Sequence, residues 1–236
     1  MIAFARAAQA GLVHISTMSV AGEAFQDAGR REPAVFTEED FFIGQNWQDN
    51  IYVRGKFLAE AEVLRAAQAG LPVRIFRAGR LVGRASDGMF QKNPNSNTFY
   101  HLICALRALR AIPASLAQLP VDLTPVDTCA ETAAALLDVP CTVAHLFEET
   151  PQNFGALARA LVPDAALLSD ADFEARLFLL SGETRGIAVE MWNRLHAAPP
   201  VIRPDSHRTH ALLRAHGIPW QTSGPDILLK QFRIDG

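Results

Sequence analysis

The first part of the chain alternates two short apolar runs with one long helical repeat. Leu12–Ile15 form an apolar run that continues into residues 16–20, and residues 72–82 form a second run rich in β-formers. Between them, apolar positions recur at helical spacing from about residue 50 to residue 69, and Gly70 follows as a helix terminator. A strand, a long helix and a strand predict a βαβ unit with two parallel, buried strands.

The residues before the first strand predict the end of an amphipathic helix, with Gly11 as its C-cap. Arg6 lies inside this apolar stretch, whereas a secretory leader carries its positive charge before the apolar stretch. The chain therefore opens in mid-helix and runs directly into a core strand, which is an unusual start for a natural domain.

The remaining sequence predicts two groups of elements. Strands near residues 121–124 and 143–147, with helices near 99–111 and from Pro125, continue the α/β pattern. Beyond residue 151 the pattern predicts helices without strands, over about 152–162, 170–180, 184–197, 205–216 and 225–233. The expected fold class is α/β, with a partial Rossmann-like parallel sheet in residues 1–150. A helical lobe in residues 151–236 should pack over the carboxyl ends of the strands.

Composition narrows the class of protein. The chain has 236 residues, of which 49% are hydrophobic and 20% charged, and this is typical of a folded globular protein. A net charge of -3 argues against nucleic-acid binding, and no apolar run is long enough to predict a membrane span. Three cysteines without CxxC spacing argue against a disulfide scaffold or a zinc site, so a cytoplasmic protein without a metal is expected. His207, His210 and His216 are interpreted as part of a solvated helix.

The strongest local motif is Tyr52-Val-Arg-Gly-Lys56 at the start of the long predicted helix. A spacing of four residues places both side chains on one helix face. An ammonium group beside a phenol favours the phenolate, which makes the phenol usable for proton transfer near neutral pH. The alternative is an ordinary solvated helix start.

A hydroxyl cluster, Ser16-Thr17-Met18-Ser19, follows the first predicted strand. Ligands of open α/β sheets bind outside the carboxyl ends of the strands, so a hydroxyl there is well placed to polarise a carbonyl group. The alternative is a strand end whose hydroxyls only cap the backbone.

A strand-end hydroxyl followed by YxxxK resembles the extended short-chain dehydrogenase/reductases. The segments HISTMSVAG (14–22), GRASDGMFQKNPNSNTFY (83–100) and VDLTPVDTCAETAAALL (121–137) narrow this resemblance. They are similar to the thioester reductase domains that end nonribosomal peptide synthetases, which have relatives in carboxylic acid reductases. The C-terminal segment PDSHRTHALLRAHGIPW (204–220) resembles the same domains, so the similarity covers essentially the whole chain.

This resemblance implies a set of site residues. The catalytic residues would be Thr17, Tyr52 and Lys56. The nicotinamide cofactor, NADPH, would contact Ser16, Lys56, Ala78, Gly79 and Leu81. The acyl substrate would contact Met18, Asp87, Gly88, Phe90 and Gln91. The implied reaction is the NADPH-dependent reductive release of an acyl or peptidyl thioester from a phosphopantetheinyl carrier protein, as an aldehyde or an alcohol.

One departure from the family pattern concerns the cofactor phosphates. The glycine-rich GxxGxxG loop that binds a pyrophosphate at a helix N-terminus does not occur in this sequence. On the order of 100 residues of earlier βα units would precede the first strand in the family. The chain is therefore expected to be the C-terminal part of a reductase, truncated or split, and inactive alone.

Two alternatives to a reductase module remain. The chain could be a non-catalytic or split-protein fragment that acts by association, as a homo-oligomer or with a complementing N-terminal fragment, because missing strands leave an open sheet edge. The second alternative is an extended reductase that acts on a nucleotide sugar, but the SDGxFQ and TPVDxCAxA strings argue against it.

Overall fold

A computed structural model describes residues 1–30, 32–94, 97–182, 185–186, 189, 192, 201–222 and 224–234. The chain forms two compact units whose segments alternate along the sequence. The first unit comprises Met1–Leu81, Val126–Glu149 and Pro200–Thr222. The second comprises Val82–Pro125, Thr150–Pro199 and Ser223–Gly236. Within the described residues, no helix is both long and apolar enough to span a membrane.

The first unit is built on a parallel sheet of three strands, β1 (Leu12–Thr17), β3 (Val73–Ala78) and β8 (Val143–Leu146). The strand order is β1-β3-β8, and all pairs are parallel, so β3 is central. The helix α2 (Ile51–Gln68) connects β1 to β3, which confirms the predicted βαβ unit. In the register of the sheet, Thr17 lies opposite Ala78, and Ala78 lies opposite Leu146. These three residues mark the carboxyl end of the sheet.

Local signals in the sequence set the limits of α2. Asn50 caps its first turn, because the side-chain oxygen accepts hydrogen bonds from the backbone N–H groups of Tyr52 (2.9 Å) and Val53 (3.1 Å). Beyond the last turn, Gly70 has a φ of 88°, a conformation that favours glycine. The predicted start and end of this helix are confirmed.

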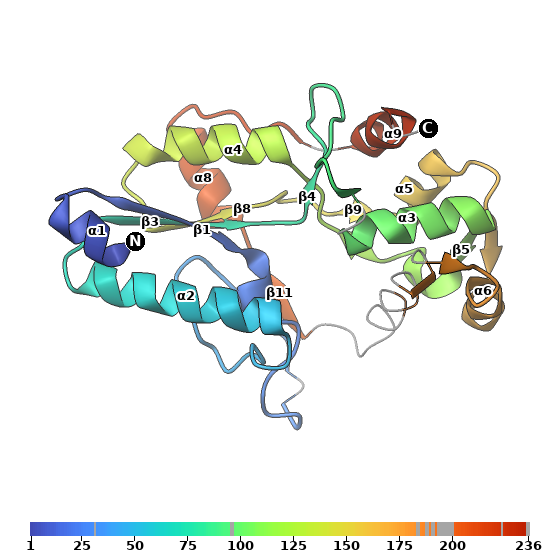
Figure 1. Cartoon of the computed structure of the whole chain (residues 1–236), viewed down its shortest axis with the longest axis horizontal. Helices are drawn as coiled ribbons and strands as arrows, with labels where there is room; N and C mark the ends of the chain where they lie inside the picture. The colour runs from blue at the N-terminus through green and yellow to red at the C-terminus, as the bar shows by residue number, and fades with distance from the viewer. Residues whose placement is uncertain are drawn as a thin grey trace. The chain divides into compact units, whose positions relative to one another are not determined.

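Helices cover both faces of the sheet (Figure 1). On one face, α1 (Ile2–Ala7) and α2 bury apolar side chains against β1 and β3. On the other face, α4 (Val126–Ala135) and α8 (His207–Ala215) pack against β3 and β8. The rest of the first unit consists of the 3-10 helices η1 (Met18–Ala21) and η4 (Leu136–Asp138) and of β2 (Ala34–Phe36), which pairs in parallel with β11 (Ile202–Pro204).

The second unit is mainly helical and has its own core. Its helices are α3 (Thr98–Leu109), α5 (Phe154–Leu161), α6 (Asp170–Leu177), α9 (Pro225–Ile234) and the 3-10 helix η3 (Ala114–Leu116). Its short strands are β5 (Ala111–Pro113), β6 (Pro120–Val121), β7 (Thr124–Pro125), β9 (Gln152–Asn153) and β10 (Ala166–Leu168). The strand β4 (Leu81–Val82) has one residue in each unit. The helices enclose fully buried apolar side chains such as Ile103, Leu123 and Phe173.

The prediction of a C-terminal lobe without strands is wrong. The strand β9 pairs with β6, β10 with β5, and β11 with β2. These strands contain only two or three residues, too few for an alternating pattern to become visible in the sequence. The division at residue 150 also differs from the compact units, because Pro200–Thr222 belong to the first unit and Val82–Pro125 to the second. The helix predicted over 184–197 falls mostly outside the described residues.

Three local predictions need correction. Gly11 does not cap the first helix, because α1 ends at Ala7 and Gln9 takes the left-handed conformation, with a φ of 51°. The strand β1 is not buried on both faces, since Val13 and Ile15 are 46% and 54% exposed. Residues 72–82 form two strands, β3 and β4, rather than one.

Candidate functional site

The hydroxyl of Thr17 lies where β1 ends and η1 begins. Its Oγ1 accepts a hydrogen bond from the backbone N–H of Ser19 and donates one to the Ser19 hydroxyl, both at 3.2 Å. Thr17 therefore caps the following turn, as the alternative interpretation of the hydroxyl cluster expected. It is only partly buried and also lies at the carboxyl end of the sheet, so capping and ligand binding are compatible.

Tyr52 and Lys56 lie on one face of α2, as their spacing predicted. The Lys56 ammonium is 6.0 Å from the centroid of the Tyr52 ring. The same Nζ donates a hydrogen bond of 3.2 Å to the backbone oxygen of Ile15 in β1. Tyr52 is 54% exposed, so the residue is accessible to a bound molecule. Lys56 thus links the start of α2 to the end of β1.

Of the residues predicted to contact the cofactor, Ser16 has its hydroxyl turned to the interior. Ser16 is 3% exposed, and its Oγ donates to Glu60 Oε2 at 2.5 Å. Ala78 and Gly79 lie at the carboxyl end of β3, where the Gly79 N–H donates to the Leu146 carbonyl at 2.9 Å. The structure thus brings Ser16, Ala78 and Gly79 to the same end of the sheet as Thr17. Leu81 follows shortly after and is 39% exposed.

The residues predicted to contact the substrate belong to different parts of the fold. Met18 lies in the first unit and packs against a buried apolar cluster that includes Val20 and Phe57. The remaining four, Asp87, Gly88, Phe90 and Gln91, are in the second unit.

The second-unit residues are held by local contacts. Asp87 accepts hydrogen bonds from Arg84 Nε and from the Met89 N–H, both at 2.9 Å. These bonds, the one from Arg84 above all, hold the pKa of the exposed Asp87 carboxyl below its usual range. The Phe90 ring stacks on the Tyr100 ring with centroids 6.3 Å apart. The Gln91 amide donates to the Asn93 carbonyl at 2.6 Å.

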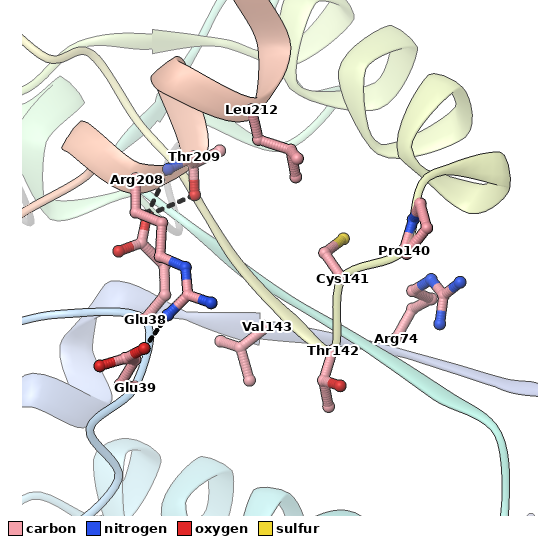
Figure 2. Close-up of a pocket in the computed structure, with 10 residues that line it drawn as sticks. All are labelled: Glu38, Glu39, Arg74, Pro140, Cys141, Thr142, Val143, Arg208, Thr209 and Leu212. Atoms are coloured by element: carbon pink, nitrogen blue, oxygen red, sulfur yellow. Dashed lines mark hydrogen bonds and ion pairs between the residues drawn. The ribbon is translucent and has the colours of Figure 1, made fainter. Parts of the chain in front are cut away.

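A pocket of about 670 Å³ lies in the first unit but at a different place (Figure 2). Its lining includes Arg74 near the start of β3, Val143 at the start of β8, and Arg208 and Leu212 on α8. The amino-terminal ends of β3 and β8 are opposite to the carboxyl end that carries Thr17. None of the predicted site residues lines this pocket.

Three buried ionisable residues behind the candidate site were not predicted. Glu60, Arg77 and His145 have no exposed surface. Glutamate and arginine are most often solvated surface residues, so residue type alone did not distinguish Glu60 and Arg77. His145 lies in an apolar run. The one available signal was the position of Glu60, which follows Lys56 by one helical turn. Across the described residues, no group of three His, Cys, Asp or Glu side chains is arranged to hold a metal ion.

Comparison with known proteins assigns the chain to a family. A sequence model of the family described as male sterility protein (NAD_binding_4) matches residues 1–133. The chain belongs to this family. No curated protein sequence matches significantly.

Solved structures extend the similarity over the whole chain. The chain is 27% identical to a thiolation-reductase di-domain from an archaeal non-ribosomal peptide synthetase, with a TM-score of 0.84 over 98% of this chain and 50% of that one. It is 25% identical to the reductase domain of the aureusimine biosynthetic cluster, with a TM-score of 0.84 over 99% and 63% of the two chains. A reductase domain of a Mycobacterium tuberculosis nonribosomal peptide synthetase shares the fold at 20% identity, with a TM-score of 0.72 over 95% and 59%.

These matches confirm the α/β fold and the predicted resemblance to reductase domains of nonribosomal peptide synthetases. The chain spans between half and just under two thirds of the length of these three structures.

Proposed function

We propose that the chain is the catalytic part of a reductase that uses a nicotinamide cofactor, NADPH, to release an acyl or peptidyl thioester from a carrier protein. The observation that carries this proposal is the placement of Tyr52 and Lys56 on α2, with Lys56 bonded to β1 just before Thr17. The similarity to a thiolation-reductase di-domain supports a carrier-bound substrate.

The residues at the carboxyl end of the sheet fit the nicotinamide end of such a cofactor. The half-buried Lys56 amine can donate to ribose hydroxyls, and the backbone of Ala78 and Gly79 borders the same end of the sheet. When bound, the cofactor supplies a hydride to the carbonyl carbon of the substrate. The choice of NADPH rather than NADH rests on the family resemblance.

The side chains of this chain would handle the oxygen and the proton. The Thr17 hydroxyl would donate a hydrogen bond to the carbonyl oxygen and stabilise the negative charge that develops there. Tyr52 would donate its proton, and the Lys56 ammonium beside it would stabilise the phenolate that remains. One hydride and one proton convert the thioester to an aldehyde and a free thiol, and a second pair gives the alcohol. In the second unit, the turn that contains Asp87 and Gly88 would contact the acyl chain.

Replacement of Tyr52 by phenylalanine tests the proton donor. Tyr52→Phe should lower turnover of a carrier-bound thioester by about a hundredfold or more, because a positioned general acid contributes this much. The affinity for NADPH should stay nearly unchanged. Tyr100→Phe is the matched control, since Tyr100 is the other tyrosine of the sequence.

The assay follows NADPH oxidation with the chain alone and, where that is inactive, with the chain joined to a complementing N-terminal part. Normal turnover by Tyr52→Phe with greatly weakened cofactor binding would contradict the role of proton donor.

The cofactor affinity of the 236 residues alone is a separate prediction. Much of the affinity for a dinucleotide comes from backbone N–H groups of a glycine-rich turn, and such a turn does not occur in this sequence. The chain alone should therefore bind NADPH weakly or not at all and should reduce no thioester unaided. A calorimetric or fluorescence titration measures this directly, and micromolar affinity would show that another segment forms the phosphate site.

Association is the second candidate function, and the edge of β1 favours it. Within the described residues, β1 is an edge strand of its sheet, and Val13 and Ile15 on it are about half exposed. Unpaired strand edges with apolar side chains tend to pair with other strands. The proposed occupant is a second copy of the chain or a complementing N-terminal fragment.

A further inference from the structure

A buried ion pair connects α2 to β3 close to the candidate catalytic residues. Arg77 in β3 and Glu60 in α2 are both fully buried. Glu60 Oε1 accepts hydrogen bonds from Arg77 Nε at 2.9 Å and from the Arg77 terminal nitrogen Nη2 at 2.6 Å. The other carboxylate oxygen, Oε2, accepts the hydrogen bond from the Ser16 hydroxyl at 2.5 Å. Both oxygens of Glu60 are therefore occupied by fixed partners.

The remaining donors of Arg77 also have partners, which fixes the orientation of the guanidinium. Nη2 donates to the backbone oxygen of Asp40 at 2.7 Å, and Nη1 contacts His145 Nε2 at 2.9 Å. Burial of His145, opposed in part by a hydrogen bond to the Asp205 carbonyl, lowers its pKa to about 4, so the ring is neutral near pH 7. Its Nε2 can then accept from Arg77 while Nδ1 donates to the Asp205 carbonyl at 2.5 Å.

This arrangement attaches α2 to the end of β1 at two successive helical turns. Lys56 donates to the carbonyl of Ile15, and Glu60, one turn further along α2, holds the hydroxyl of the next residue, Ser16. Thr17 follows Ser16 directly. A shift of α2 along β1 would break both hydrogen bonds, and it would move Lys56 relative to Thr17.

We propose that Glu60, held by Arg77, is a positioning residue that fixes Lys56 and Thr17 relative to each other through Ser16. The inference rests on the proposed function, because it concerns the placement of the proposed catalytic residues. Glu60 touches neither substrate nor cofactor in this role. Its carboxylate acts as a fixed anchor, since a buried charge that is fully hydrogen-bonded has little freedom to move.

The variant Ser16→Ala tests the proposal without breaking the ion pair. The matched control is Ser206→Ala, because Ser206 is also buried in the first unit (2% exposed) and its hydroxyl has no hydrogen-bond partner in the structure. Hydrogen exchange of the whole chain should become about tenfold faster at residues 15–20 and 52–56 in Ser16→Ala, in line with the loss of a hydrogen bond to a charged group. Exchange in the β3–β8 pairing should change little, and Ser206→Ala should leave both regions unchanged.

A second measurement separates positioning from general stabilisation. The chain has three lysines, Lys56, Lys92 and Lys230, so acylation of each amine can be followed by mass spectrometry with the other two as internal references. In Ser16→Ala, Lys56 should react severalfold faster relative to exposed Lys92, because its hydrogen bond to Ile15 is no longer fixed. An unchanged Lys56 ratio, with or without a lower urea midpoint, would overturn the proposal.

The variant Glu60→Gln is the direct test at the anchor itself, with Glu62→Gln as control. Glu62 lies on the same helix, but its side chain is 59% exposed. If Glu60→Gln folds, Lys56 acylation should rise as in Ser16→Ala, and an unchanged ratio would overturn the proposal. If it does not fold because Arg77 is left unpaired, Ser16→Ala decides. Neither readout needs cofactor or substrate, so failure of the proposed reductase activity and failure of this positioning role are distinguishable.

Discussion

His145 links the stability of the first unit to pH through a single buried ring. In the folded chain its pKa is lowered from 6.5 to about 4, mainly by burial. Below pH 6.5 the unfolded chain binds a proton at this residue, whereas the folded chain does not until about pH 4. The folded state should therefore lose stability as the pH falls through this window, by about 3 kcal/mol in all from this residue.

This prediction can be checked at the residue and on the whole chain. The NMR titration of the His145 ring should have its midpoint near pH 4. In urea unfolding at pH 7 and pH 4.5, His145→Asn should lose less stability on acidification than the natural chain. His216→Gln, at an exposed position, should keep the natural pH dependence. A His145 midpoint near 6.5 would contradict the prediction.

Among single residues, the sequence predicted those side-chain pairs that depend only on local spacing. Tyr52 and Lys56 share a helix face because helical geometry alone places residues four apart side by side. The contacts of Glu60 with Ser16 and Arg77 depend on how α2 packs on two strands, and no local pattern encodes them. A buried charged residue is rare unless it is paired, and no pattern in the sequence showed that Glu60 and Arg77 would be partners.

Among the elements, α9 packs against the turn of residues 84–89 at a glycine that has no room for a side chain. Gly88 has a φ of 77°, and a Cβ built on it would lie 2.7 Å from the Gln231 backbone nitrogen in α9. The same two segments are joined by hydrogen bonds of 3.1 Å, from the Gly83 N–H to the Gln231 side chain and from Lys230 Nζ to the Ala85 carbonyl. The turn and the helix therefore pack as one piece.

Replacement of this glycine should be costly. Gly88→Ala should lower the free energy of unfolding by about 2–4 kcal/mol, since backbone strain and a steric clash add together. Gly182→Ala is the control, because Gly182 also has a positive φ, 72°, but an added Cβ meets nothing within 4 Å. It should lose only about 1 kcal/mol from strain. Urea unfolding followed by circular dichroism measures both, and equal losses would show that the contact with α9 contributes nothing.

The elements also show which parts of the fold local sequence patterns can predict. The helix α2 was predicted within one residue because it has a polar cap, a long repeat and a terminal glycine. The strands β9, β10 and β11 were missed because each is fixed by a partner far along the chain, as β11 is by β2. Pairing of this kind is a tertiary effect, and two or three residues carry too little pattern to reveal it.

For the whole molecule, the exposed edge of β1 predicts that the chain associates with another chain. If this edge pairs with another copy, a charged side chain on it should prevent pairing. Val13→Lys should abolish concentration-dependent association in sedimentation velocity. Leu58→Lys should not, because Leu58 is similarly exposed (48%) but lies on the helix α2 and not on a strand edge. A natural chain that stays monomeric at high concentration would overturn the association.

The alternation of the two units along the chain has a consequence for synthesis on the ribosome. Segments of the two units follow each other in turn, and the last segment of the first unit, Pro200–Thr222, includes α8. The nascent chain therefore presents the apolar face of β3 and β8 without α8 until translation has passed that segment. During this time the Thr209 hydroxyl, which accepts from the His145 N–H at 2.8 Å, is also missing. Chains that emerge N-terminus first keep such surfaces open to chaperones and to aggregation, so we expect the yield of folded protein to rise with chaperone supply.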